Sequence, residues 1–142
     1  MGNNTNDNYP AAAVRHFKDG KILHQYDRPD NAMCHYAFSA ECGIKTLYEQ
    51  LYSKSGFVLK HGVAKTWSEM LQYYDILRIM DARAGAFLGN RTIPARLFEN
   101  HPARRYWDNI TYTEDDLDQA CAFSEQLTRQ IISEILDGKI MI

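Results

Sequence analysis

The sequence lacks the motifs by which most enzyme classes are recognised. Its 142 residues contain no His-Glu-x-x-His zinc motif, no paired Cys-x-x-Cys, no acidic calcium loop, no glycine-rich phosphate loop and no Gly-x-Ser-x-Gly elbow. These absences exclude the enzyme classes that are easiest to identify from sequence. They also give no reason to expect a metal or another cofactor.

Cysteine and long apolar runs are scarce as well. The three cysteines, Cys34, Cys42 and Cys121, are an odd number in helical patterns, so we expect reduced thiols that pack as small apolar side chains. The N-terminal segment has neither a basic start nor an apolar run, and no stretch approaches the length of a membrane span. The expected location is the cytoplasm, with no membrane partner.

Neither positive nor negative charge is in large excess. The formal net charge is −2 and the sequence pI is about 6.2, which argues against a protein coated in basic residues but leaves room for a local basic patch. An apolar content of 45% in 142 residues is enough for one domain with a sizeable core. We expect a disordered polar tail over residues 1–9 and a single helical domain over residues 10–142.

Two helices are predicted in the first third of the chain. Tyr9-Pro10 opens the first, which should run to residue 26 before a break at residues 27–30. The second carries an apolar seam at helical spacing, with a start capped by Asp30 or Asn31. The seam consists of Met33, Ala37, Ala40, Ile44, Leu47 and Leu51. Small residues on or beside it should admit a close partner helix, and Glu41 and Lys45, four apart, are placed to pair.

Two capping boxes mark later helices. Residues 66–69 (TWSE) begin an amphipathic pattern that reaches Met80, and residues 113–116 (TEDD) begin a last helix that ends before Gly138. Residues 82–111 are expected to be irregular. No segment alternates as a strand does, so the prediction is an all-α, antiparallel bundle of four to five helices.

Arginine is concentrated between the last two predicted helices. The six residues are Arg78, Arg83, Arg91, Arg96, Arg104 and Arg105. Guanidinium groups bind phosphate and neighbouring aromatic rings stack on bases, so Arg91, Arg104, Arg105 and Tyr106 are candidate contacts for RNA or a nucleotide. The alternative is that these arginines pair with acids on neighbouring helices or solubilise a loop.

Arg96 and His101, with four residues between them, are the candidate catalytic pair. A histidine transfers protons near neutral pH and an arginine stabilises the charge that develops on phosphate, which suffices for metal-free RNA cleavage by the 2′-hydroxyl. Arg28 and His35 satisfy the same loose spacing. The other histidines, His16, His24, His35 and His61, are expected to have structural roles.

Three segments carry a resemblance to a known family. They are residues 12–19 (AAVRHFKD), residues 28–32 (RPDNA) and residues 36–47 (YAFSAECGIKTL), supported by His61 and Trp67 and by Arg105-Tyr106 before the last helix. Together they resemble the HEPN superfamily, named for domains of higher eukaryotes and prokaryotes. The likeness extends from about residue 10 to residue 137.

The resemblance implies a bundle of four or five helices, commonly dimeric. Many members are ribonucleases, often toxins or antiviral effectors, whose site is an Arg, four to six residues and a His, assisted by a polar residue of the second helix. Carried over, Arg96 and His101 match the spacing and Glu41 is the assisting residue. This sequence departs from the catalytic pattern, because Leu97 stands where a polar residue commonly follows the Arg and Pro102 follows His101.

Three hypotheses follow. The first is an RNA-directed HEPN-like domain acting as a metal-independent endoribonuclease homodimer. The second is a non-catalytic module that binds RNA, a nucleotide or a nucleotidyltransferase-type antitoxin partner. The third is a helical interaction or immunity protein that binds another protein. Burial of Arg96 or His101 would argue against the first, and basic and aromatic groups without a convergent histidine would favour the second.

Overall fold

A computed structural model describes residues 8–47, 50, 93–107 and 110–140. These residues form α1 (Tyr9–Gln25), α2 (Pro29–Leu47), the 3-10 helix η3 (Ala103–Tyr106) and α5 (Glu114–Leu136). The described part of the chain holds three packed helices and no strand, which confirms the all-α class. The helix expected to begin at Thr66 lies outside the described residues, as do residues 1–7 of the tail expected over residues 1–9, whereas Tyr9 already belongs to α1.

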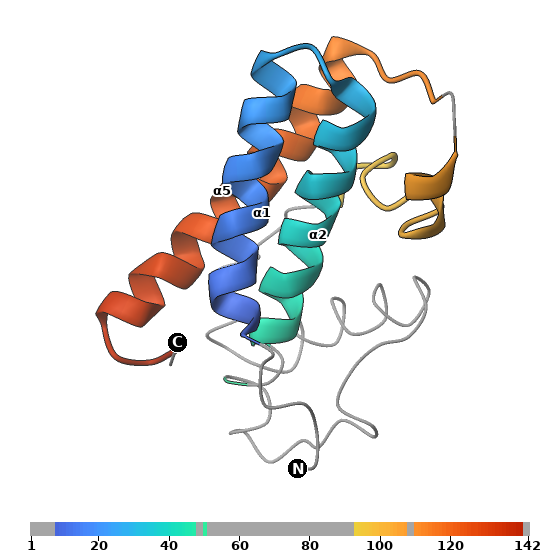
Figure 1. Ribbon diagram of the computed structural model, residues 1–142. Helices are drawn as coiled ribbons and strands as arrows, with labels where there is room; N and C mark the ends of the chain where they lie inside the picture. Colours follow the sequence, from blue (N-terminus) through green and yellow to red (C-terminus); the bar gives the residue numbers. More distant parts are fainter. Residues whose placement is uncertain (1–7, 48–49, 51–92, 108–109, 141–142) are drawn as a thin grey trace.

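The three long helices pack on one another in pairs (Figure 1). α1 and α2 form an antiparallel hairpin, and α5 packs against both, running in the same direction as α2 (Figure 1). The turn segment that carries η3 lies beside α2. α2 therefore contacts every other described element.

Local signals account for the helix ends. The Asn8 side chain accepts a hydrogen bond from the Ala11 amide, and a left-handed Asp27 (φ 61°) follows the end of α1. α2 begins at Pro29, so Asp30 and Asn31 lie in its first turn and the prediction that one of them caps the helix was wrong. The fixed φ of proline suits a first helical turn, so the helix begins earlier than predicted.

Small residues allow the helices to approach closely, as predicted. The described part of the seam on α2 is almost completely buried, from Met33 to Leu47. A Cβ atom on Gly43 would lie 2.8 Å from Leu127 of α5, and one on Gly20 would lie 2.8 Å from the Tyr36 ring. The side-chain hydroxyls between the helices donate to backbone carbonyls, because buried polar groups need partners.

The last helix also begins and ends as its sequence predicts. Thr113 and Asp116 form the reciprocal capping box, and Gly138 follows the C-terminus with a φ of 76° that suits glycine. The chain then turns back, and Ile140 is buried in the core. None of the described helices is both long and apolar enough to cross a membrane.

Candidate functional site

Arg104 holds together the irregular segment that precedes α5. Its guanidinium donates to the carbonyl oxygens of Arg96 (2.8 Å) and Glu99 (3.0 Å), and to that of Leu97. It also donates to the Tyr112 hydroxyl, and the residue is 1% exposed. Arg104 was predicted to contact nucleic acid, but these contacts give it a structural role.

His101 and Glu41, 60 residues apart, meet between this segment and α2. The imidazole Nε2 donates to Glu41 Oε1 at 2.8 Å, and the ring packs at 4.7 Å from the Phe38 ring. The His101 side chain is only 3% exposed, since Phe38 and Phe98 also contact it. The structure therefore brings together two of the three predicted catalytic residues in a covered position.

Glu41 is ionised in this pair. Burial opposes its ionisation, but hydrogen bonds from His101 and Lys45 and the charge of Lys45 lower its pKa to about 2. The Lys45 ammonium lies 2.5 Å from Glu41 Oε2, which confirms the predicted pair. Because an ionised carboxylate only accepts hydrogen bonds, Glu41 fixes His101 with its Nε2 protonated.

Arg96, the third predicted catalytic residue, faces a different helix. Its guanidinium pairs with Glu99 at 3.1 Å and with Asp116 in the capping box of α5 at 3.2 Å. It also donates to the Thr111 carbonyl and lies over the Tyr112 ring. Burial opposes the charge, but hydrogen bonds to the two carboxylates raise the pKa of Arg96. Its positive charge is thus compensated within the chain, by groups other than the Glu41–His101 pair.

An exposed basic and aromatic surface lies next to His101. We name Phe38, Arg105, Tyr106 and Trp107 the η3 surface. Tyr106 and Trp107 are 77% and 51% exposed, respectively. The Arg105 guanidinium lies 4.6 Å from the centre of the Tyr106 ring and 6.0 Å from that of Phe38. Arg105 and Tyr106 are therefore accessible, as their predicted contact with RNA requires, whereas Arg91 lies outside the described residues.

Two further histidines contact each other near Phe38. His16 of α1 and His35 of α2 place their Nδ1 atoms 3.0 Å apart, and their rings lie 5.3 and 6.4 Å from the Phe38 ring. Burial first, and then the neighbouring His35, lower the pKa of His16. Sequence reasoning missed this group because its histidines belong to different helices. The one available signal was His16 and Asp19, which stand three apart and so share a face of α1.

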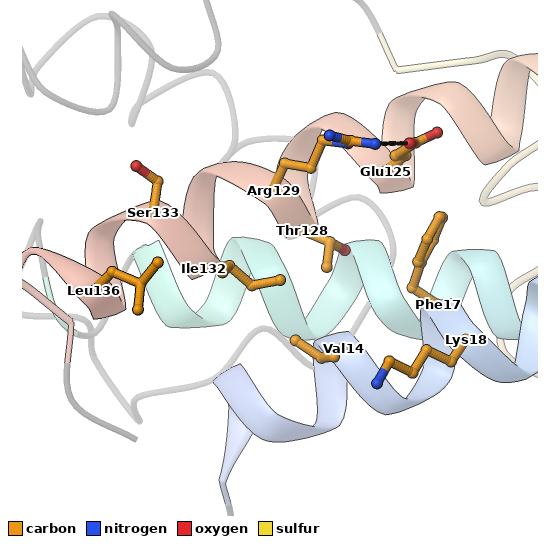
Figure 2. Close-up of a pocket in the computed structure, with 9 residues that line it drawn as sticks. All are labelled: Val14, Phe17, Lys18, Glu125, Thr128, Arg129, Ile132, Ser133 and Leu136. Atoms are coloured by element: carbon orange, nitrogen blue, oxygen red, sulfur yellow. Dashed lines mark hydrogen bonds and ion pairs between the residues drawn. The ribbon is translucent and has the colours of Figure 1, made fainter.

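A separate apolar groove runs between α1 and α5, with a volume of about 530 Å³. Figure 2 shows the side chains of Val14, Phe17 and Ile132 directed into it, with Lys18 and the Arg129–Glu125 ion pair along its edges. Leu136 at one end is 81% exposed. The groove holds no member of the Glu41–His101 pair or of the η3 surface.

Comparison of the chain with protein-family models, curated proteins and solved structures finds no match. Membership of the HEPN superfamily therefore stays a prediction from the sequence motifs. The chemistry open to the site follows from its own residues, which offer a buried carboxylate–imidazole pair, a cation on exposed aromatic rings and a two-histidine cluster.

Proposed function

We propose that this chain is an RNA-directed, HEPN-like domain that binds single-stranded RNA through the η3 surface. The observation that carries the proposal is the position of Arg105 against the Tyr106 ring, which is 77% exposed. Trp107, at 51%, extends the aromatic area. Exposed rings of this size beside an unburied guanidinium are typical of a surface that stacks bases and neutralises phosphate.

Arg105 is a better candidate for phosphate binding than Arg96 and Arg104, because the guanidinium groups of those two are held by other groups of the chain. Arg96 is paired with two carboxylates and Arg104 donates to three backbone carbonyls. Arg105 instead donates to the Pro102 carbonyl and the Tyr106 hydroxyl, both neutral groups. Its charge is therefore the one best placed to meet a phosphate.

Burial favours binding over cleavage. A general base must reach the 2′-hydroxyl of RNA, and the His101 side chain is 3% exposed. Arg96 also pairs with Asp116 of α5, whereas His101 pairs with Glu41 of α2. The groups that are accessible, Arg105, Tyr106 and Trp107, are suited to binding RNA and not to cleaving it.

Fluorescence anisotropy with a labelled single-stranded RNA of mixed sequence tests the proposal. Tyr106→Ala should raise the Kd about 5- to 150-fold, since a stacked base contributes about 1–3 kcal/mol. Arg105→Gln should reduce the slope of log K against log salt by about 0.7, the loss of one phosphate contact. Leu136→Ala and Arg129→Gln, which remove exposed groups at the α1–α5 groove, are the matched controls and should leave binding unchanged. Equal affinity in all five proteins would refute the η3 surface as the RNA site.

A metal-independent endoribonuclease is the second candidate, favoured by the 2.8 Å hydrogen bond that orients His101 on an ionised Glu41. In this hypothesis Arg96 binds the scissile phosphate, His101 moves protons, and a homodimer under control of a nucleotidyltransferase-type partner forms the site. The same RNA, incubated in EDTA, gives the second readout. Cleavage to cyclic phosphate ends by the wild type but not by His101→Ala would establish this candidate, and equal activity in both would exclude His101 as its catalyst.

A further inference from the structure

His16, Asp19 and His35 form a cluster that neither the candidate catalytic pair nor the η3 surface uses. One ligand atom from each residue lies within 4.8 Å of the other two. The histidines come from two helices that pack as a hairpin, so their separation is fixed by the α1–α2 contact and not by a loop. Asp19 stands one helical turn after His16 and faces the same side of α1.

We propose that His16, Asp19 and His35 bind a divalent transition-metal ion, with Zn²⁺ as the best-fitting member of this class. The proposal goes beyond RNA binding and does not depend on it. Two imidazole nitrogens and a carboxylate oxygen are a donor set that suits zinc and its first-row neighbours.

The geometry of the two rings supports this assignment. Two nitrogens bound to one tetrahedral zinc at about 2.0–2.1 Å are separated by about 3.3 Å. The Nδ1 atoms are 3.0 Å apart and share a proton in a hydrogen bond; an ion takes the place of that proton once both rings carry their proton on Nε2 and the two atoms separate by a few tenths of an ångström. Three protein ligands leave the fourth position of a tetrahedral ion to water, as in zinc sites that are not closed by the protein.

A second cluster in the described residues, His24 with Glu114 and Asp118, fits a metal less well. It offers one imidazole where the first cluster offers two, and the other nitrogen of its histidine lies 3.0 Å from the Tyr36 hydroxyl. Its two carboxylates are both exposed, whereas the proposed site has one exposed carboxylate, Asp19, beside two half-buried imidazoles. This cluster therefore serves as a control for the first.

Zinc titration of the untagged full chain by isothermal calorimetry, with Co²⁺ absorption as a second probe, tests the site. One equivalent should bind, and Co²⁺ should show visible bands of four- or five-coordination. Asp19→Asn and His35→Gln should each weaken zinc binding at least about tenfold, which corresponds to about 1.4 kcal/mol. Asp118→Asn and His24→Gln should bind as the wild type does.

Three results would overturn the proposal. They are zinc binding that survives in both Asp19→Asn and His35→Gln, an equal loss in Asp118→Asn, and no stoichiometric binding by the wild type. Circular dichroism of each variant separates the loss of a ligand from the loss of the fold. Asp19→Asn keeps the size of the side chain, so it reports on the ligand even where His35→Gln disturbs the packing of α1 on α2.

Discussion

Glu41 binds one side chain of its own helix and one of the segment before α5. One carboxylate oxygen accepts from His101 and the other lies against the Lys45 ammonium. The pair with Lys45 was predictable, because residues four apart on a helix are neighbours. The contact with His101 was suggested only by the family resemblance, since nothing in the spacing of two residues 60 positions apart defines their distance.

The pKa of Glu41 makes a prediction for acid stability. It is lowered from 4.5 to about 2 in the folded chain, so the stabilisation is complete above the unfolded pKa of 4.5 and is lost as pH falls from about 4.5 toward 2. A shift of this size corresponds to about 3 kcal/mol. Urea unfolding between pH 6 and pH 3 should show a shallower loss of stability in Glu41→Gln than in the wild type.

Glu125→Gln is the matched control for this measurement. Glu125 also pairs with an arginine four residues later, but that Arg129 side chain is 74% exposed and the pair contributes little. Its pH dependence should follow the wild type. A Glu41→Gln profile that also follows the wild type would show that the contacts described above do not lower the pKa of Glu41.

At the scale of elements, the close contact between α1 and α2 explains why a glycine stands at position 20. In an isolated helix Gly20 costs about 1 kcal/mol relative to alanine. In the folded chain a Cβ at this position would lie 2.8 Å from two ring carbons of Tyr36, whose backbone carbonyl accepts a hydrogen bond from α5. Helix propensity gives only the cost of Gly20, because the Tyr36 ring that packs against it is 16 residues away in the sequence.

Gly20→Ala should therefore destabilise the chain despite its better helix propensity. The clash should outweigh the gain and lower the free energy of unfolding by about 1–3 kcal/mol, measured by urea denaturation. Ala122→Gly, on the exposed face of α5, reports the propensity term alone and should cost about 1 kcal/mol. A more stable Gly20→Ala protein would mean that the two helices are not in close contact at this point.

Sequence periodicity predicted the helices better than the contacts between them. The apolar seam of α2, the capping box of α5 and the left-handed Gly138 were all identified correctly, because each depends on residues within a turn or two of one another. The clustering of His16 with His35, and the separate partners of Arg96 and His101, depend on how helices pack. Those relations are tertiary and leave no local pattern in the sequence.

At the scale of the whole molecule, α2 occupies the centre of the described part. It packs against α1, α5 and η3, while η3 contributes a four-residue 3-10 helix with an exposed outer face. Backbone amides in the middle of α2 should therefore open only when the whole domain unfolds, and those of η3 should open locally. Hydrogen exchange should be slowest in peptides covering residues 36–44 and much faster in those covering residues 103–107.

Gly20→Ala provides the control for this expectation. If α2 exchanges only by global unfolding, the variant should accelerate exchange in α1, α2 and α5 by the same factor and leave η3 almost unchanged. Faster exchange in α2 than in η3 would contradict the central position of α2.

Phe38 has a consequence for how ligands would influence one another. Its ring lies near His101 and Arg105 and also near the His16–His35 pair. A ligand that displaces this ring at either cluster changes the free energy of binding at the other. Thermodynamic linkage then requires reciprocity: the factor by which an ion alters the affinity for RNA equals the factor by which RNA alters the affinity for the ion.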